Sequence, residues 1–498
     1  MKNALSGSLA RFSLIALVAT FVACGPEDRA ETTLDFDGGI AIERDGGTSE
    51  PVDAGSAPVD AGPTVVDDDA DGYGDDVDCD DHDPARNPGA AELCNGVDDN
   101  CDSEIDEGVR TTFYADTDED GYGALDVSVA ACEAPPMYVA SAGDCDDADA
   151  NVNPDATEIC DGVDNDCDST TSEDGLATFF DPSGAHADVT EVLTTGTAET
   201  PALVQTAAPG RVNICSGTYY LGLEALHSLE IVGIAGAEAT ILDGGGQRTV
   251  LSVTTDDVLL EVEGVTIRNG EATNMAASAA TEELGLVGGG LYCDAAASVQ
   301  VRDAIVENNH AESGGGVFGN GCTVLLDSTI VRDNTADIYG GGVTVTSRAL
   351  RLVDAVITRN AAGTRGGGIL CWGRDANAVC RMYDTLVSQN SAGHSGAGFY
   401  INAYPGRSVR GTCRGTTEAA YAGMVDNYAG SDTGTGARFY AGAGATWTFE
   451  STDCDWGTAA AGDDNEGDDI RIAGFGSGDV YTDFGDNETF ACDQMGCQ

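Results

Sequence analysis

Aspartates stand at alternate positions in two short segments of the chain, and a glycine and a tyrosine follow each set. The segments are Asp67, Asp69 and Asp71 before Gly72 and Tyr73, and Asp116, Asp118 and Asp120 before Gly121 and Tyr122. This pattern matches the first seven positions of an EF-hand-like loop, in which the carboxylates converge on calcium. Like charges about 4 Å apart repel by roughly 1 kcal/mol per pair in water, so each cluster favours a hard cation. Each segment therefore predicts a calcium site.

Each predicted site needs further ligands, because calcium takes about six to eight oxygens. In the first segment we expect them to be the main-chain carbonyl of Tyr73 and the carboxylate of Asp78, at loop position twelve. In the second segment the carbonyl of Tyr122 takes the same role, but Val127 occupies position twelve. The residues expected to fold back and replace it are Asp144, Asp146 or Asp147.

Residues 67–175 contain two copies of one acidic unit, each opened by one of these segments. The matching stretches are Asp78–Asp81 with Asp144–Asp147, and Glu92–Asp102 with Glu158–Asp168. The region holds 35 acidic residues and only two basic ones, Arg86 and Arg110. Too few apolar side chains remain for a hydrophobic core, so metals and disulfides must supply the stability. A second acidic cluster in each copy is either another metal site or a solvated loop: Asp98, Asn100 and Asp102, and Asp164, Asp166 and Asp168.

These units resemble the metal-binding repeats grouped with copper-binding surface proteins of the MopE type, and they are similar to thrombospondin type 3 calcium repeats. The resemblance covers residues 67–175. The family name implies copper, yet this region has one histidine, His82, one methionine, Met137, and no tryptophan. Hard oxygen ligands select calcium over copper. Calcium is therefore the predicted cofactor, and copper is the alternative.

Seventeen cysteines occur in the chain, and sixteen remain when Cys24 is set aside. Disulfides are the default for an exported chain with an even number of cysteines. The near neighbours expected to pair are Cys94 with Cys101, Cys160 with Cys167, Cys132 with Cys145, Cys371 with Cys380, and Cys492 with Cys497. Cys79 has no obvious partner.

Residues 1–23 are typical of an export signal, in which Lys2 and Arg11 precede an apolar run too short to span a membrane. The stretch Phe21-Val-Ala-Cys24 resembles the lipobox of bacterial lipoproteins, which implies that Cys24 is lipidated and becomes the N-terminus. Plain secretion with cleavage near Ala23 is the alternative. An outer-membrane lipoprotein exposed at the cell surface is expected, with residues 24–66, rich in Pro, Gly and Asp, as a disordered tether.

Residues 176–498 are rich in glycine and repeat with a period of 26. Glycine triplets begin at Gly288, Gly314, Gly340 and Gly366, and Asn308, Asn334, Asn360 and Asn390 recur with short β runs before them. A fixed period without a helical pattern predicts stacked coils. We therefore predict an all-β fold, a right-handed single-stranded parallel β-helix with caps, preceded by a disulfide- and calcium-stabilised irregular acidic domain. The rod resembles the pectate-lyase-like superfamily, and its repeats are similar to those of polymorphic outer-membrane proteins.

The formal net charge of −64 excludes nucleic acid as a partner. We predict a monomeric, non-enzymatic surface lipoprotein whose rod serves adhesion, glycan binding or envelope structure, with an extracellular glycan or surface protein as partner. A surface polysaccharide lyase or hydrolase is an alternative from fold analogy, and a copper-binding surface protein is another. The pairs weighed for lyase chemistry are Arg332, Arg359 or Arg381 beside Asp333, Asp354 or Asp384, while His310 and His394 are expected in turns.

Overall fold

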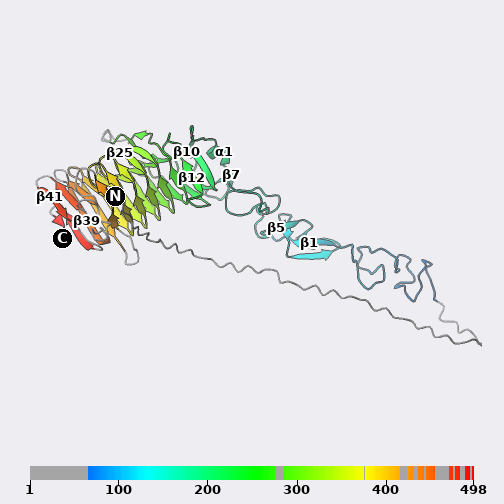
Figure 1. Ribbon diagram of the computed structural model, residues 1–498. Helices are drawn as coiled ribbons and strands as arrows, with labels where there is room; N and C mark the ends of the chain where they lie inside the picture. The colour runs from blue at the N-terminus through cyan, green and yellow to red at the C-terminus, as the bar shows by residue number, and fades with distance from the viewer. Residues whose placement is uncertain are drawn as a thin grey trace, which may run out of the picture.

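The computed structural model describes residues 65–275, 284–374, 376–415, 423–429, 436–441, 445–454, 470–474, 477–482, 488–493 and 496–497. The described chain is nearly all β, with long sheets of parallel strands and one short helix among these residues, α1 (Thr190–Thr194) (Figure 1). The predicted signal peptide, Cys24 and nearly all of the predicted tether lie outside the described residues. No helix among the described residues is long and apolar enough to cross a membrane.

Four sheets form a stack of coils, which we call the stack. Sheet 1 contains β7 (His186–Asp188), β6 (Ala177–Phe180), β9 (Gly210–Ile214), β11 (Leu229–Gly233), β14 (Leu259–Glu263), β19 (Ser298–Arg302), β23 (Thr323–Asp327), β27 (Arg348–Val353), β31 (Ala378–Tyr383), β35 (Ser408–Arg414), β39 (Thr446–Cys454), β42 (Glu488–Asp493) and β43 (Gly496–Cys497). Sheet 2 contains β8 (Ala202–Gln205), β10 (Gly217–Ala225), β13 (Leu251–Val253), β18 (Leu291–Cys293), β22 (Val317–Asn320), β26 (Val343–Thr346), β30 (Ile369–Gly373), β34 (Phe399–Ala403), β38 (Ala437–Ala441), β40 (Ile470–Gly474) and β41 (Ser477–Thr482).

Sheets 3 and 4 complete each coil. Sheet 3 begins with the first residues of β10 and continues with β12 (Thr240–Asp243), β15 (Thr266–Arg268), β20 (Ile305–Glu307), β24 (Ile330–Arg332), β28 (Val356–Thr358), β32 (Leu386–Ser388) and β36 (Gly423–Val425). Sheet 4 contains β16 (Asn274–Met275), β17 (Leu286–Val287), β21 (His310–Ser313), β25 (Thr335–Tyr339), β29 (Ala361–Ala362), β33 (Ser391–Ala392) and β37 (Tyr428–Ala429). One coil runs through β22, β23, β24 and β25, and β26 then pairs in parallel with β22.

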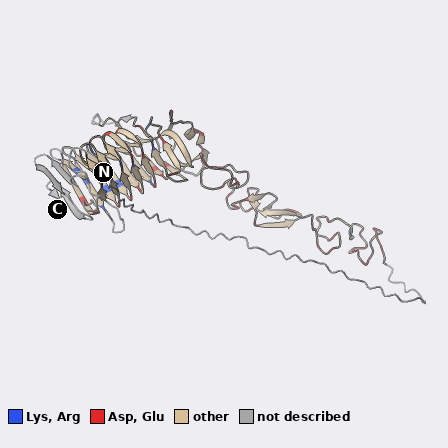
Figure 2. Cartoon of the chain, viewed as in Figure 1, with Lys and Arg blue, Asp and Glu red and all other residues tan. Residues whose placement is uncertain are grey.

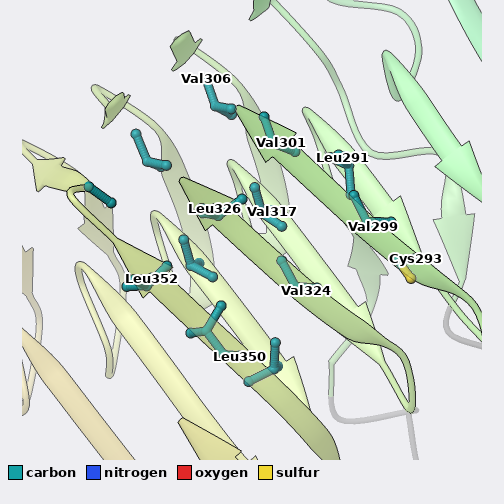
Figure 3. Packing of buried hydrophobic residues seen from close by; sticks show 14 of the residues in the cluster. Leu291, Cys293, Val299, Val301, Val306, Val317, Val324, Leu326, Leu350 and Leu352 are labelled. Atoms are coloured by element: carbon teal, nitrogen blue, oxygen red, sulfur yellow. The ribbon is translucent and has the colours of Figure 1, made fainter. Parts of the chain in front are cut away.

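The 26-residue period sets the register of the stack. Val317 pairs with Val343, and Val343 pairs with Ile369, each 26 residues further along the chain. Aliphatic side chains of successive coils therefore lie on one another inside the stack, where Val324, Leu326 and Leu352 are fully buried (Figure 3). Full burial of such a side chain contributes roughly 1.5–3 kcal/mol relative to exposure, so these columns of residues supply the stability of the stack.

A ladder of buried asparagines runs along the stack beside sheet 3. The main-chain N–H and the Nδ2 of Asn309, Asn334, Asn360 and Asn390 donate to the Oδ1 of the asparagine one coil further on, at 2.9–3.1 Å. Its members are Asn309, Asn334, Asn360, Asn390 and Asn427. The prediction that Asn308 belongs to this ladder was wrong. Asn308 is exposed with a φ of 54°, and Asn309 takes the place because the first step of the ladder spans 25 residues rather than 26.

The first and the third position of each triplet need glycine, each for a different structural reason. The first, as at Gly340, has a φ of +63°, which L side chains rarely adopt. The third faces the asparagine ladder, and a Cβ on Gly342 would lie 3.0 Å from the Nδ2 of Asn360. The triplets are therefore turn and packing positions of the coil.

Antiparallel strands cover the edges at both ends of sheet 1. At the N-terminal end β6 pairs antiparallel with β9 and with β7. At the C-terminal end β42 pairs antiparallel with β39, and β43 with β42. Such strands interrupt the parallel series, and an exposed sheet edge that could bind another chain is thereby covered.

Residues 67–175, which we call the acidic arm, leave the stack near β7 and α1 (Figure 1). The arm has only short strands: β1 (Thr111–Ala115), β2 (Gly123–Ala124), β3 (Ser128–Ala131), β4 (Tyr138–Val139) and β5 (Ala142–Asp144). Carboxylates take the place of an apolar core. Glu92 is buried and accepts hydrogen bonds from the main-chain N–H groups of Asp99, Asn100 and Asp106.

Seven disulfides connect described cysteines, and most predicted pairings were wrong. Within each acidic unit the bond spans 22 residues, Cys79–Cys101 and Cys145–Cys167, so Cys101 does not pair with Cys94, nor Cys167 with Cys160, nor Cys145 with Cys132. The remaining pairs are Cys94–Cys132, Cys160–Cys215, Cys293–Cys322, Cys413–Cys454 and, as the sequence predicted, Cys371–Cys380. Cys492 and Cys497 are register partners in β42 and β43, and their side chains lie outside the description.

Cys94 and Cys160 occupy equivalent positions in the two acidic units and both reach forward to the next part of the chain. Cys94 bonds to Cys132 of the second unit, and Cys160 bonds to Cys215 in the first coil of the stack. The Nδ2 of Asn213 also donates to the carbonyl of Cys160 at 2.9 Å. The second unit is therefore joined to the stack by a covalent bond and a buried hydrogen bond.

His310, expected in a turn, begins β21 instead and lies between two carboxylates. Its Nδ1 is 2.9 Å from Oε1 of Glu271, and its Nε2 is 3.3 Å from Oδ1 of Asp337. Burial of the ring lowers the pKa of His310, but the hydrogen bonds to both carboxylates outweigh it, and the net pKa is raised above 6.5. His394 lies in a bend, as expected.

We expect an NMR titration to give His310 a pKa above 6.5 and the Glu271→Gln variant to give a lower value. Because the folded pKa is raised, the stabilisation is fully present below pH 6.5 and is lost as the pH rises through the folded pKa. The chain has five histidines, so the resonances are readily assigned. A His310 pKa at or below 6.5, or one insensitive to the Glu271 substitution, would contradict this pairing.

Candidate metal centres in the acidic arm

The two opening loops of the arm share one backbone conformation. The fourth residue has positive φ in both, 65° at Ala70 and 67° at Glu119, and the glycine two residues later has φ of 105° at Gly72 and 100° at Gly121. Residues between the aspartates thus turn the chain sharply and place the alternating carboxylates on one concave side. The sequence identified the two glycines, but it did not indicate that Ala70 and Glu119 also have positive φ.

The same hydrogen bonds orient the carboxylates in both loops. In the second loop the N–H of Gly121 donates to Oδ2 of Asp116 at 3.2 Å, and the N–H of Tyr122 donates to Oδ1 of Asp120 at 2.8 Å. Asp118 accepts from the N–H of Asp120 at 3.2 Å. In the second loop one oxygen of each of these three carboxylates is held by the backbone, so its other oxygen is free to point into the loop.

In the second unit five carboxylates converge, and we call this cluster centre 2: Asp116, Asp118, Asp120, Asp144 and Asp147. Oxygens of Asp116, Asp118 and Asp147 lie within 4.8 Å of one another, as do those of Asp118, Asp120 and Asp144. Asp144 comes from β5 and Asp147 follows it, so the fold brings back two of the three residues expected to complete the second site. Asp147 is fixed by Thr117, whose N–H and hydroxyl donate to its two oxygens at 2.8 and 2.7 Å.

Four carboxylate oxygens of centre 2 are buried and have no hydrogen-bond partner among the described residues. They are Oδ1 of Asp116 and Oδ2 of Asp118, Asp120 and Asp144. Asp116 and Asp144 are each only 5% exposed. Buried charged oxygens without partners are strongly unfavourable, so this arrangement favours a bound cation at neutral pH.

The carboxyl groups of centre 2 also raise one another's proton affinity. Burial, followed by the charges of Asp120, Asp116 and Asp147, raises the pKa of Asp118 above 3.8. Burial and the charges of Asp120 and Asp118 raise the pKa of Asp144 likewise. A divalent cation would reverse this effect, because it neutralises the charge that each carboxylate feels.

The first unit has a similar cluster, centre 1, with Asp67, Asp69 and Asp71 within 4.8 Å of one another. Asp78 joins it electrostatically, since burial and then the charges of Asp71, Asp78 and Asp67 raise the pKa of Asp69. One difference separates the centres. Oδ2 of Asp71 accepts a hydrogen bond from Nδ2 of Asn87 at 2.5 Å, whereas the equivalent oxygen of Asp120 has no partner among the described residues.

We expect centre 1 to bind calcium about tenfold more weakly than centre 2, because Asn87 competes for a ligand oxygen through a hydrogen bond to a charged group. The Asn87→Ala variant should reduce this difference in calcium affinity between the two centres, as measured by calorimetric titration. The matched control is Asn153→Ala at the equivalent position, where Nδ2 donates to the carbonyl of Ala150 instead. Equal affinities in the unmodified chain would contradict the expectation.

Other predicted ligands have different outcomes. Asp146 is exposed, and its described contribution is the main-chain N–H that donates to Oδ1 of Asp144 at 2.8 Å. The Tyr122 hydroxyl bonds to Asp155, which raises the pKa of Tyr122. The carbonyls of Tyr73 and Tyr122 stay predicted ligands.

The second acidic cluster of the first unit repeats the loop geometry. Cys101 and Ser103 have φ of 63° and 77°, and the N–H of Ser103 donates to Oδ2 of Asp98 at 2.9 Å, as Gly121 does to Asp116. Oδ1 of Asp98 is buried and without a partner among the described residues. In the second unit Cys167 has the same positive φ, at 56°. The prediction of a solvated loop or a metal site therefore stays open for this cluster, but its backbone is that of the opening loops.

The sulfur atoms near these carboxylates are unsuited to copper. Cys79 and Cys101 lie beside Asp78, but they form a disulfide. Metals bind the thiolate form of cysteine, so the donor set of both centres consists of oxygens. Oxygen donors favour calcium, magnesium or manganese.

Two segments of the chain, residues 78–107 and 144–173, match the MopE-type copper-binding family model, which is described as a "putative metal-binding motif". The resemblance stated from the sequence is confirmed for these segments. They include Asp78 and Asp144 but begin after the two opening loops. No curated protein and no solved structure matches the chain.

Two of the three arginines weighed for lyase chemistry, Arg332 and Arg359, form ion pairs between successive coils. Arg332 lies 2.6 Å from Glu307, and Arg359 makes two hydrogen bonds to Asp333 at 2.8 and 2.7 Å. Arg381 is exposed on sheet 1. These pairs join neighbouring coils along the face of the stack.

Proposed function

We propose that the chain is a calcium-binding surface protein, in which the acidic arm holds the stack away from its point of attachment. The observation that carries the proposal is the set of four buried carboxylate oxygens at centre 2, on Asp116, Asp118, Asp120 and Asp144, that lack partners in the described chain. Calcium is the common extracellular cation that accepts several carboxylates in an irregular shell. Copper is less well supported, because no thiolate, methionine or histidine belongs to either cluster of ligands.

The disulfides support a spacer role for the arm. Each unit carries one internal bond and one forward bond, so the two units and the stack form a covalently linked series. Aspartates and glutamates occur throughout the arm (Figure 2). With calcium bound, the repulsion between them falls, and the linked series becomes stiffer. The stack is then held as a rigid body for adhesion, glycan binding or envelope structure.

The stack is proposed to be a right-handed parallel β-helix. Its parallel strands are joined in the order sheet 2, sheet 1, sheet 3, sheet 4, and crossovers between parallel strands of one sheet are right-handed in the great majority of proteins. Lipidation at Cys24 and an outer-membrane location are further proposals that rest on the lipobox resemblance. Mass spectrometry of the mature N-terminus tests them, and an unmodified Cys24 would remove the anchor.

A calorimetric titration of the chain with calcium, magnesium and cuprous ion tests the calcium proposal. We expect calcium binding at two or more sites with dissociation constants of about 10⁻⁴ M or tighter. Asp118→Asn should abolish the site at centre 2, whereas Asp126→Asn, at an exposed aspartate of the same unit, should leave it intact. Cuprous binding that survives excess calcium would instead favour a copper protein.

A further inference from the structure

A pocket of about 260 Å³ lies on the side of sheet 2 that faces away from the core of the stack. Trp372 of β30, Asn402 of β34 and Tyr440 of β38 occupy successive register positions. Side chains at such positions point to the same side of a sheet, so these three form a column along the pocket. Tyr339 and Arg365, which pair through an isolated bridge, also line it.

The same column runs through earlier coils, where its polar side chains satisfy one another. Nδ2 of Asn320 donates to Oδ1 of Asp294 at 2.9 Å, and the hydroxyl of Thr346 donates to Oδ1 of Asn320 at 2.7 Å. Thr346 is the register partner of Trp372. Nε1 of Trp372 and Oδ1 of Asn402 are buried without a partner among the described residues, and their side chains are 3% and 8% exposed. Most buried polar atoms have a partner, so this unsatisfied pair indicates a ligand.

Arginines bring positive charge to the pocket without carboxylates beside them. Arg365 and Arg438 line it, and no aspartate or glutamate is among the described residues that do so. Nε of Arg365 is buried without a partner in the described chain, and the guanidinium lies 5.5 Å from the ring centre of Tyr400. Arg374, which is 8% exposed, lies 5.1 Å from the ring centre of Trp372. Buried guanidinium groups without a counter-ion are unfavourable, so the pocket favours an anion.

The balance of donors and acceptors distinguishes between anions. Buried donors of Arg365, Arg374 and Trp372 have no partner among the described residues, and they suit the oxygens of an anion. Oδ1 of Asn402 is instead an acceptor, so it requires an O–H group on the same ligand. Carboxylates and sulfate are fully ionised at neutral pH and lack such a group. A phosphate monoester has one, because its second pKa is about 6.

The size and the walls of the pocket indicate what the phosphate is attached to. A water molecule takes about 30 Å³ of the liquid, so the four oxygens of a phosphate take about 120 Å³ and fill less than half of the pocket. The rings of Tyr339, Trp372 and Tyr440 line the pocket as well. Aromatic rings pack favourably against one another, so the remaining space suits a small aromatic ring.

We propose that this pocket binds a phosphate monoester of a small aromatic alcohol. Arg365 binds the phosphate oxygens, the Trp372 indole N–H donates to one of them, and Oδ1 of Asn402 accepts from the protonated one. The ring of the ligand packs against Tyr339 and Tyr440. This site goes beyond the calcium role of the arm and does not depend on it.

Calorimetry of the full chain at pH 6 in EGTA tests the proposal, with phenyl phosphate, inorganic phosphate, sulfate and benzoate as separate probes. EGTA removes calcium, through which an anion could bind to the arm. At pH 6 about half of a phosphate monoester keeps one proton. We expect saturable binding of phenyl phosphate, several-fold weaker binding of inorganic phosphate, and still weaker binding of sulfate and benzoate.

Three results of this titration would overturn the proposal. The first is an absence of phenyl phosphate binding. The second is sulfate binding as tight as that of inorganic phosphate, because charge alone favours the doubly charged sulfate. The third is binding of benzoate or inorganic phosphate as tight as that of phenyl phosphate, because the pocket would then select neither the phosphate nor its aromatic ring.

Variants separate binding from folding. Arg365→Gln should weaken phenyl phosphate binding about tenfold or more, because it removes a charge-assisted hydrogen bond. Asn402→Ala should reduce the preference for inorganic phosphate over sulfate, because the acceptor is lost. Asn320→Ala is its matched control in the same column, since it removes the acceptor of the Thr346 hydroxyl and should lower the melting temperature without changing that preference.

Arg381→Gln, which removes the same charge from the exposed face of sheet 1, should have no effect on phenyl phosphate binding. Equal losses in Arg381→Gln and Arg365→Gln would reduce the interaction to net charge and refute the pocket. An unchanged preference for phosphate over sulfate in Asn402→Ala would refute the role of its oxygen.

Discussion

Chelation of calcium is expected to lower the melting temperature of the acidic arm by about 10 °C or more, while the stack melts as before. At a calcium concentration about tenfold above the dissociation constant of centre 1 and about a hundredfold above that of centre 2, binding at the two sites contributes about 4 kcal/mol. For a unit of roughly 100 residues, each kcal/mol shifts the transition by about 4–8 °C. The physical source is the set of unpartnered carboxylate oxygens at centre 2, whose charge a bound cation would neutralise.

Differential scanning calorimetry with and without EGTA measures this shift, and tryptophan fluorescence assigns the transition of the stack. The arm has no tryptophan, whereas Trp372 and Trp447 are buried in the stack. In the Asp118→Asn variant, EGTA should have about a third of its effect, because only the weaker centre 1 still binds. An arm transition that EGTA leaves unmoved would mean that disulfides and backbone hydrogen bonds alone stabilise it.

We expect a second large effect, a loss of stability, when one asparagine of the ladder is replaced. Asn309→Ala should destabilise the neighbouring coils by about 4 kcal/mol. Its Oδ1 accepts from the N–H of Gly270 at 2.8 Å, and its Nδ2 donates to the carbonyl of Ile267 at 3.1 Å. Alanine leaves the Gly270 N–H buried without this acceptor, at about 1–3 kcal/mol, and it also removes the side-chain bonds to the Ile267 carbonyl and to Asn334, at about 1 kcal/mol each.

Native-state hydrogen exchange reads this effect locally, because a stack of coils need not unfold in one step. Protection should fall most in β15 and β20, which flank the lost rung. Asn308→Gly is the matched control. It alters an adjacent, exposed asparagine with positive φ, and should change stability by no more than about 0.5 kcal/mol. Similar losses in both variants would show that the ladder contributes nothing specific.

The architecture of the stack was predictable because its signal is periodic. A 26-residue spacing of glycines predicts stacked coils, and the observed register pairs residues 26 apart. The identity of a single rung was not predictable where two asparagines stand side by side. Asn308 and Asn309 are chemically identical, and only the local coil length, 25 residues rather than 26, decides which one faces inward.

Disulfide connectivity could not be predicted from proximity along the chain. Cys94 lies seven positions from Cys101 in sequence, yet it bonds to Cys132 in the next unit. The repeat itself held a usable signal, because Cys79 and Cys145 occupy equivalent places and their partners lie 22 residues further on in both units. Equivalent cysteines of the two units should have equivalent partners, and the observed 22-residue pairing meets this condition. Pairing each cysteine with its nearest neighbour instead leaves Cys79 without a partner.

The alternating aspartates identified the opening loops of both centres, but not how the sites are completed. Asp147 joins centre 2 because Thr117, 30 residues earlier, holds it there. The role of Asn87 at centre 1 also depends on a contact between residues 16 apart.

Anomalous diffraction from crystals of the chain grown in calcium chloride tests the central claim most directly. The account predicts an anomalous peak at centre 2, enclosed by oxygens of Asp116, Asp118, Asp120 and Asp144, and a weaker one at centre 1. An empty centre 2 in millimolar calcium, or a copper ion there that calcium does not displace, would contradict it.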